Sequence, residues 1–350
     1  MTSTNVSPAS AGRTPDPGAD VGTSALAVNG LSVEFDTERG PVQVLHDVSF
    51  RVERGMTLGL VGESGSGKTV SSLAVMGLLD PRISRITSGS VHVEGVDMHA
   101  LDAAERREFQ GGRIAMIFQE ARRSLDPVFT VGAQIAESVR AHTTMSRKQA
   151  WARAVEMLDL VGIPNAARRA HEYPHMFSGG MCQRVMLAAA LAPRPSVLLA
   201  DEPTTALDVT VQAQMLQLLR DLQKEMGLGI LFITHDLGVV AEMCDRVAVM
   251  YAGQVIEAGD TEQIFDHPRH PYTEGLIRSL PDTAAHKGRL VAIPGSVPPA
   301  HRWPVGCHFG PRCEYATPDC HLAPVPLTRQ SDGGAVRCLH SDEVDLEGVR

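Results

Sequence analysis

Residues 62–69 read GESGSGKT, which is the pattern G-x-x-x-x-G-K-[ST], between the apolar run 58-LGLV-61 and a predicted helix that begins near Lys68. Glycines at these positions let successive backbone N–H groups turn inward around phosphate oxygens, and the N-terminus of the helix adds partial positive charge. Lys68 is placed to reach the β- and γ-phosphates of a nucleotide, and the Thr69 hydroxyl to ligate Mg²⁺. We therefore predict a phosphate-binding P-loop. Its predicted nucleotide ligands are Gly62, Glu63, Ser64, Gly65, Ser66, Gly67, Lys68 and Thr69.

Composition narrows the class of protein. With 43% hydrophobic and 21% charged residues, the chain reads as a soluble globular protein, and 350 residues allow two domains or one domain with an appendage. A net charge of −9 without any block of lysine and arginine disfavours nucleic-acid binding. The sequence contains neither the run of about 20 apolar residues needed for a membrane span nor the pattern of a signal peptide. We therefore expect a cytoplasmic protein.

The apolar pattern divides the chain into regions. Residues 1–25 are rich in Ser, Thr, Pro, Gly and Ala, and we predict a disordered tail. The segments 31-LSVEF-35 and 48-VSFRV-52 alternate apolar and polar residues, as half-buried antiparallel strands do, and residues 90–96 predict a further strand. Residues 131–192 have a mostly helical pattern. These signals predict an antiparallel β subdomain and a helical subdomain.

Two carboxylates follow a short apolar run. The run 197-VLLA-200 predicts a buried parallel strand, and Asp201 and Glu202 come directly after it. Ligands of parallel sheets bind at the carboxyl ends of the strands. We predict that Asp201 belongs to the magnesium shell and that Glu202 is the general base that polarises the attacking water.

Two further polar residues follow apolar runs. Gln119 comes after 114-IAMIF-118, and His235 comes after 231-LFIT-234. A lone Gln or His at a strand end is more often an ordinary loop residue than a catalytic one. After a P-loop and a pair of carboxylates, however, both positions suit residues that sense a γ-phosphate. We therefore predict catalytic roles for Gln119 and His235, with Gln119 also in the magnesium shell.

The order of these motifs resembles the ATP-binding-cassette (ABC) ATPases, and 177-FSGGMCQR-184 is similar to the signature loop of that family, usually written LSGGQ. The resemblance implies that Ser178, Gly179 and Gly180 complete the ATP site of a second subunit. It also implies that Asp208, in 205-TALD-208, couples the two sites and that Phe35 stacks on adenine. The chain departs from the family at Met181, where glutamine is usual, and in 120-EARRS-124.

Four of the six cysteines lie near the C-terminus. Cys307, Cys313, Cys320 and Cys338 have five, six and seventeen residues between them. In a reducing compartment such a group favours a metal over disulfides. Structural zinc sites use closer cysteine pairs, and iron–sulfur clusters also use four thiolates, so spacing alone leaves zinc and iron–sulfur open. We expect Cys244 to be an ordinary buried thiol and His301, His308 and His340 to be solvated loop residues.

The C-terminal part resembles the ATPases of oligopeptide and dipeptide importers. The segments that carry the likeness are 270-HPYT-273, 294-PGSVP-298 and 306-GCHFGPRC-313, and it extends over about residues 27–340. In that subfamily such a cysteine set is associated with a [4Fe-4S] cluster. The resemblance therefore implies a cluster held by Cys307, Cys313, Cys320 and Cys338, with zinc as the alternative.

Together these observations predict an α/β fold. We expect a P-loop ABC ATPase core at residues 26–265 with an antiparallel β subdomain, a helical subdomain at about 131–192, and a cysteine-containing C-terminal extension at 266–350. By resemblance, the cofactors are ATP, Mg²⁺ and the [4Fe-4S] cluster, with Mg²⁺ held by Thr69, Gln119 and Asp201.

The resemblance implies that the chain hydrolyses ATP to drive uptake of oligopeptides or dipeptides. The expected partners are two transmembrane permease subunits, a related second ABC ATPase in a heterodimer, and an extracytoplasmic solute-binding protein; nucleic acid is not expected. The chain then lies at the cytoplasmic face of the membrane. The alternatives are an importer of nickel or another small solute and, less favoured, a soluble ABC ATPase of DNA repair or translation.

Overall fold

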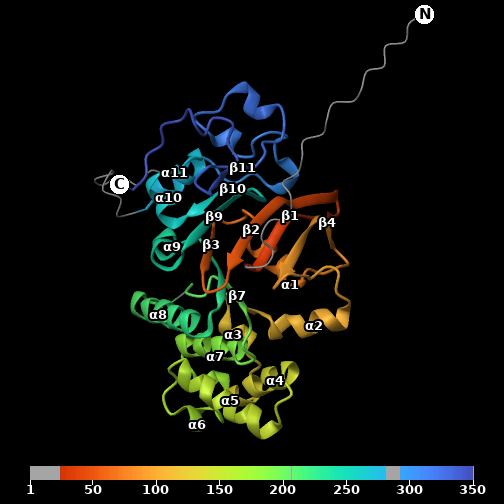
Figure 1. The fold of residues 1–350 in the computed structure, drawn as a ribbon, viewed down its shortest axis with the longest axis vertical. Coiled ribbons are helices and arrows are strands. Elements are labelled where there is room, and N and C mark those ends of the chain that lie inside the picture. Colours follow the sequence, from red (N-terminus) through yellow and green to blue (C-terminus); the bar gives the residue numbers. More distant parts are fainter. Residues whose placement is uncertain (1–23, 206, 281–291, 350) are drawn as a thin grey trace, which may run out of the picture.

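The computed structural model describes residues 24–205, 207–280 and 292–349. These residues form two sheets, a group of helices at one end, and a C-terminal part at the opposite end (Figure 1). The predicted α/β fold with an antiparallel β subdomain and a helical subdomain is confirmed. Residues 1–23 of the predicted tail lie outside the described residues. Ser24 and Ala25, which the prediction placed in the tail, belong to β1 (Ser24–Thr37).

The smaller sheet is antiparallel and contains both strands predicted from alternation. Its order is β2-β1-β4-β5, with β2 (Gly40–Glu53), β4 (Ser84–Val93) and β5 (Val96–Asp97) beside β1. The strands β1 and β2 are much longer than 31–35 and 48–52, because they pair as one continuous hairpin around the turn at residues 38–39. Side chains of β1, including Leu26, Val28 and Leu31, are fully buried in a core shared with β3, and a register shift between Val28 and Leu31 interrupts the strict alternation.

The larger sheet contains the predicted parallel strands. Its order is β11-β12-β10-β9-β3-β8-β7-β6, and β9, β3, β8, β7 and β6 run parallel. These parallel strands are continuously apolar because both faces of the sheet are covered. The bounds are β3 (Thr57–Val61), β6 (Ile114–Ile117), β7 (Val197–Asp201), β8 (Gly229–Thr234), β9 (Arg246–Tyr251), β10 (Gln254–Asp260), β11 (Thr328–Arg329) and β12 (Ala335–Val336).

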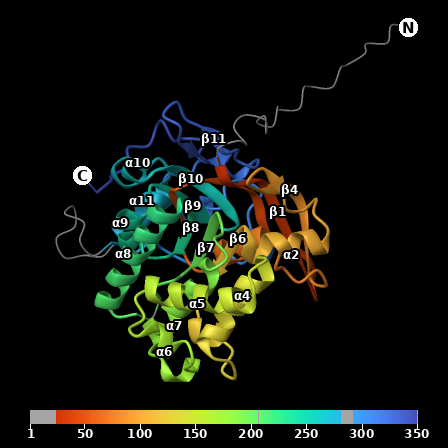
Figure 2. The same cartoon turned by 60° about the horizontal axis from the view of Figure 1, so that its bottom comes forward.

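The predicted helical region forms the helices at the lower end of Figure 1, and the same helices stay grouped in Figure 2. They are α4 (Val131–His142), α5 (Arg147–Leu160), α6 (Ala166–Arg169) and α7 (Gly179–Leu191). Local sequence defines where they start: Ser146 and Gln149 form a reciprocal capping box at α5, which satisfies two backbone donors at that helix end. Apolar faces of α4, α5 and α7 pack together around Ile135, Ala154 and Leu187.

The remaining helices flank the sheets and connect their strands. They are α1 (Lys68–Met76), α2 (Ala103–Gly112), α3 (Ala121–Ser124), α8 (Val209–Met226), α9 (Leu237–Met243), α10 (Thr261–Asp266) and α11 (Pro271–Arg278), with the 3₁₀ turns η1 (Pro174–Met176), η2 (Ala300–Arg302), η3 (Gly310–Arg312) and η4 (Pro318–His321). Within the described ranges, none of the helices combines the length and the apolar character that crossing a bilayer requires.

The C-terminal extension is joined to the larger sheet. The strand β12 pairs antiparallel with β10, so the sheet continues into the extension. The buried Arg337 donates from Nε to the Val255 carbonyl at 3.0 Å and from Nη2 to Asp47 Oδ2 at 3.0 Å. The domain boundary between residues 265 and 266 stays a prediction. These contacts show that the extension packs directly on both sheets of the core.

Candidate functional site

The predicted site residues converge at one edge of the larger sheet. In the parallel register Val61 lies opposite Thr234, Asp201 opposite Ile233, and Ile117 opposite Ala200. Because the strands run in the same direction, their carboxyl ends meet at this edge. The P-loop, the Asp201–Glu202 pair, Gln119 and His235 therefore leave the sheet side by side, as the sequence predicts.

The P-loop has the backbone that its glycines allow. Gly62, Gly65 and Gly67 have φ of 151°, 82° and 108°. A Cβ at Gly62 would lie 2.2 Å from the Met250 carbonyl oxygen, which no side chain can accommodate. The loop therefore needs glycine there, both for its backbone angles and for its close approach to β9.

Two polar groups of the loop are available to a phosphate. Lys68 Nζ donates to the carbonyl oxygens of Gly62 at 2.7 Å and Glu63 at 3.0 Å. Burial lowers the pKa of Lys68, against the opposing charges of nearby carboxylates. The Ser66 hydroxyl is buried and has no hydrogen-bond partner among the described residues. A buried, unpartnered hydroxyl is costly, and an incoming phosphate oxygen would satisfy it.

Asp201 and Thr69 have the chemistry of a magnesium site. Burial raises the pKa of Asp201, while a hydrogen bond from the Thr69 hydroxyl opposes the shift. Mg²⁺ in nucleotide sites is held by one or two carboxylates together with substrate phosphates and water. The two oxygen groups lie next to Lys68 and fit this requirement, and their role as magnesium ligands stays a prediction.

Glu202 receives contacts from three separate segments. Gln119 Nε2 donates to its Oε2 at 2.8 Å, Thr205 Oγ1 donates to Oε2 at 2.9 Å, and His235 Nδ1 lies 3.0 Å from Oε1. Burial raises the pKa of this carboxyl, but the hydrogen bonds from His235 and Thr205 outweigh burial and lower the pKa overall. Glu202 is therefore ionised at neutral pH and able to accept a proton.

Sequence reasoning missed two of these contacts. The only feature of the sequence that could have indicated the hydrogen bond from Thr205 to Glu202 is that the two residues lie close together in the chain. Gln119 contacts Glu202, whereas the sequence places it in the magnesium shell; that role stays a prediction.

Phe35 is half-buried in β1, where it faces Val42 and Ser84 in the neighbouring strands, so adenine stacking also stays a prediction.

The signature-like loop begins α7. Ser178 caps this helix and its Oγ accepts from the Met181 backbone N–H at 3.4 Å. A Cβ at Gly180 would lie 2.9 Å from Val211 Cγ1, whereas the space around Gly179 is open. Asp208 caps α8 in a similar way, with Oδ1 accepting from the Val211 N–H at 3.0 Å. The residues predicted to face a second subunit thus also define the starts of two helices.

The four C-terminal cysteines come together. Cys307, Cys313, Cys320 and Cys338 all line one cavity, together with His340 and other side chains; we call it the cysteine cavity. Burial raises the pKa of both Cys313 and Cys338 to about 11. Among the described residues, no three Cys, His, Asp or Glu side chains are placed to share one metal ion. The [4Fe-4S] cluster and the alternative zinc ion therefore both stay predictions.

One of the three loop histidines was predicted wrongly. His308 is buried, with Nδ1 2.7 Å from the Ala252 carbonyl oxygen, and burial lowers its pKa to about 4. The reason is that the C-terminal extension docks on the turn between β9 and β10. His301 is exposed, and the half-buried His340 lies between Thr317 Oγ1 and Glu343 Oε2, each at 2.8 Å. Cys244 is buried, as predicted.

Comparison with known proteins tests the resemblance. Residues 45–205 match the family described as ABC transporter, and residues 256–320 match the family described as oligopeptide/dipeptide transporter, C-terminal region. A protein of Brucella abortus (strain 2308), named as a peptide import ATP-binding protein, is 50% identical over 313 residues, which cover 89% of this chain and 94% of the relative. The chain belongs to the ABC transporter family. The predicted resemblance is thereby confirmed.

Further relatives agree with this assignment. A Brucella ovis protein with the same kind of name is 48% identical over 330 residues, covering 91% of this chain and 98% of the relative. Among solved structures, a dimeric ATP-binding cassette, MJ0796, bound to ADP and Pi has a TM-score of 0.60 at 26% identity, covering 67% of this chain and 98% of that one. A second cassette, cbiO1 of Clostridium perfringens, has a TM-score of 0.60 at 25% identity, covering 69% and 91%. The ABC core is therefore that of an ATPase.

Proposed function

We propose that this chain is the ATP-binding subunit of an ABC importer and that it hydrolyses ATP to drive uptake of oligopeptides or dipeptides. The observation that carries the ATPase assignment is the position of Glu202. Its carboxylate lies beside the P-loop and is contacted by Gln119, Thr205 and His235. The substrate class is supported by the oligopeptide/dipeptide match at residues 256–320 and by the names of the relatives.

In this proposal each residue of the site has its own role in the reaction. The backbone of Gly62–Thr69 and Lys68 bind the phosphates, and Lys68 exchanges its bonds to loop carbonyls for bonds to phosphate oxygens. Thr69 and Asp201 would hold Mg²⁺, which when bound would neutralise charge on the phosphates. Glu202 accepts the proton of the attacking water, and Gln119 and His235 hold its carboxylate in place.

A second ATPase subunit completes the site in this proposal. Ser178, Gly179 and Gly180 at the start of α7 supply a helix N-terminus and a hydroxyl to the nucleotide of the other subunit, and Asp208 couples the two sites. The dimeric form of the similar cassette MJ0796 supports this arrangement. We further propose that the second subunit is a related ABC ATPase rather than an identical copy. Two transmembrane permeases and an extracytoplasmic solute-binding protein complete the importer, with this chain at the cytoplasmic face of the membrane.

The cysteine cavity is proposed to hold a [4Fe-4S] cluster. The proposal is supported by the four thiols that line one cavity, since iron–sulfur clusters use four thiolates, and Cys307, Cys313 and Cys320 fall within the oligopeptide/dipeptide match. Iron and acid-labile sulfide measured in protein purified without oxygen test this assignment. Stoichiometric zinc without iron would contradict it.

The substitution Glu202→Gln tests the ATPase assignment. We expect MgATP binding to remain while hydrolysis falls roughly 10²- to 10⁴-fold, because the amide cannot accept the proton of water. Glu242→Gln, at a carboxylate of α9 paired with Arg220, is the control and should keep the wild-type rate. Retained turnover in Glu202→Gln would refute its role as the base.

Purification of partners tests the importer assignment. The chain is isolated from native membranes in mild detergent, and the bound proteins are identified by mass spectrometry. Two multi-span permeases and a second ABC ATPase are expected. Recovery with ribosomal or DNA-repair proteins, under conditions that keep a control transporter intact, would favour a soluble ABC ATPase. The attached binding protein then separates peptide from nickel import when its affinity for each is measured.

A further inference from the structure

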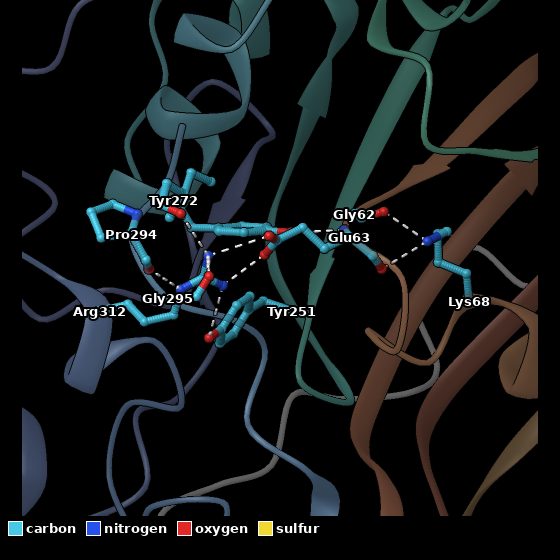
Figure 3. Close-up of polar contacts among 9 residues, drawn as sticks. Gly62, Glu63, Lys68, Tyr251, Tyr272, Pro294, Gly295 and Arg312 are labelled. Atoms are coloured by element: carbon cyan, nitrogen blue, oxygen red, sulfur yellow. Dashed lines mark hydrogen bonds and ion pairs between the residues drawn. The ribbon is translucent and has the colours of Figure 1, made fainter. Parts of the chain in front are cut away.

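The carboxylate of Glu63 is bound from outside the P-loop. Arg312, in η3 of the C-terminal extension, donates from Nη1 to Glu63 Oε2 at 2.7 Å and from Nη2 to Oε1 at 3.3 Å (Figure 3). The side chain of Arg312 is 6% exposed and that of Glu63 is 32% exposed. A two-point contact between arginine and a carboxylate fixes direction as well as distance. The second residue of the phosphate loop is thus held by a residue 249 positions further along the chain.

Arg312 is itself held rigidly. Its guanidinium donates to three backbone carbonyls of the C-terminal extension and to one buried tyrosine hydroxyl. These partners are Pro294 at 2.8 Å, Ile293 at 3.3 Å, Gly295 at 3.5 Å and Tyr251 at 3.4 Å. The bonds to Glu63 and Tyr251 raise the pKa of Arg312 although burial opposes the charged form. The guanidinium is therefore a fixed positive group beside the loop.

The backbone of Glu63 is held from two further sides. Its N–H donates to the Tyr272 hydroxyl at 2.8 Å, and its carbonyl oxygen accepts from Lys68 Nζ at 3.0 Å. Tyr272 is fully buried and belongs to α11, in the C-terminal extension. The first turn of the P-loop is thus held between that extension and the lysine that must bind phosphate.

The charge of Glu63 matters for the nucleotide. Its carboxylate is close enough to Lys68 to contribute to raising the pKa of that lysine, against the effect of burial. Left unpaired, the same carboxylate would repel a triphosphate and compete with it for Lys68. Arg312 neutralises it while leaving the phosphate-binding backbone free.

We propose that Arg312 is a positioning residue of the nucleotide site, acting through Glu63: it fixes the first turn of the P-loop and cancels the one negative side chain within the loop. The inference rests on the proposed function, since it concerns ATP binding at this loop. It makes ATP affinity depend on the docking of the C-terminal extension.

The cysteine cavity belongs to the same packed region. Cys313 directly follows Arg312, and Phe309 lines the cavity. The Phe309 ring also packs against Tyr251 and Tyr272, with ring centroids 5.2 and 5.4 Å apart. The Phe309 ring therefore lines the cavity and also contacts the two tyrosines that bind Arg312 and Glu63.

The test measures MgATP binding at equilibrium in the full chain carrying Glu202→Gln, which prevents turnover. In this background Arg312→Gln should raise the Kd at least about tenfold, the scale of a lost hydrogen-bonded charge contact. The double variant Glu63→Gln with Arg312→Gln should return to within about twofold of Glu63→Gln alone, because no carboxylate is left to neutralise. A double variant as weak as Arg312→Gln would overturn the proposal.

Arg246→Gln is the matched control. Arg246 also joins the core to the C-terminal extension, through the Gly333 carbonyl at 3.1 Å, and it pairs within the core with Asp260 at 3.2 Å. Its loss should change the Kd by less than about twofold. Equal weakening by Arg246→Gln and Arg312→Gln would mean general loosening of the extension and would overturn the proposal.

A further variant guards against misfolding. If Arg312→Gln does not fold, Arg312→Lys is compared instead, since it keeps the positive charge but loses the two-point contact, and it should still bind MgATP more weakly than the parent. An Arg312 variant that binds as tightly as the parent overturns the positioning role alone. A parent that binds no MgATP overturns the proposed function itself.

Discussion

Replacing Gly62 by alanine is a severe test of the P-loop geometry. The added Cβ would lie 2.2 Å from the Met250 carbonyl oxygen and 2.9 Å from Ser66 Oγ. An ordinary contact begins at 3.4 Å, so the loop and β9 must separate by roughly 1.2 Å, the difference between 3.4 Å and 2.2 Å. The φ of 151° adds strain for any residue with a side chain. Neither partner can yield easily, because the clash is with backbone.

The cost follows from these two effects. Backbone strain and overpacking together amount to roughly 2 to 5 kcal/mol of unfolding free energy. A displacement of about 1 Å in residues that position a substrate lowers the rate about 10²-fold. We therefore expect Gly62→Ala to lose ATPase activity by about two orders of magnitude and to unfold at a clearly lower temperature.

Gly65→Ala separates the two contributions. Gly65 has a φ of 82°, but a Cβ there meets no atom within 4 Å. Strain alone costs roughly 1 to 2 kcal/mol. Thermal unfolding of the two variants without nucleotide should therefore differ by roughly 4 to 8 °C, with Gly62→Ala the less stable. Equal unfolding temperatures, or wild-type ATPase activity in Gly62→Ala, would refute the argument from the Met250 contact.

Two other predictions concern buried groups and helix starts. Burial raises the pKa of Glu257 to about 7, whereas in the unfolded chain this group ionises near its ordinary pKa of about 4.5. The contribution of Glu257 to the free energy of unfolding therefore falls as the pH rises from about 4.5 to 7. Between pH 5 and 7.5 the wild type should lose roughly 2 to 3 kcal/mol of unfolding free energy relative to Glu257→Gln, measured by urea unfolding at each pH. A pH-independent difference between the two proteins would show that Glu257 is ionised in the folded state. In α7, Gly180→Ala should lower ATPase activity more than Gly179→Ala, because only the first meets Val211 Cγ1, at 2.9 Å; equal rates would contradict this.

The centre of the nucleotide site could be predicted from the sequence because its residues stand at the ends of strands or directly after them. Asp201 is the last residue of β7 and Glu202 follows it directly, while Gln119 and His235 each come within two residues of the end of β6 and β8. Once these strands are known to be parallel, their ends must meet at one edge. The pattern of apolar runs thus fixes both the fold of the core and the meeting of its catalytic side chains.

The C-terminal contacts could not be predicted in this way. Arg312 stands between a proline and a cysteine in a segment without periodicity, and its partner Glu63 lies 249 residues earlier. Nothing in local sequence indicates such a pairing, because it depends on how the C-terminal extension docks. The burial of His308 was missed for the same reason. Loop composition suggested solvent, but the loop packs against the turn that contains Ala252.

The charges of the free site explain why it should bind nucleotide and cation together. Burial lowers the pKa of Lys68 and raises that of Asp201, so each ionised side chain is disfavoured by its surroundings. A bound phosphate stabilises the ammonium of Lys68, and a bound cation stabilises the carboxylate of Asp201. Lys68 and Asp201 also stabilise each other's charge, and MgATP adds an opposite charge to each of them. Arg312 neutralises the carboxylate of Glu63, which leaves Glu202 and Asp201 as the carboxylates that act on Lys68.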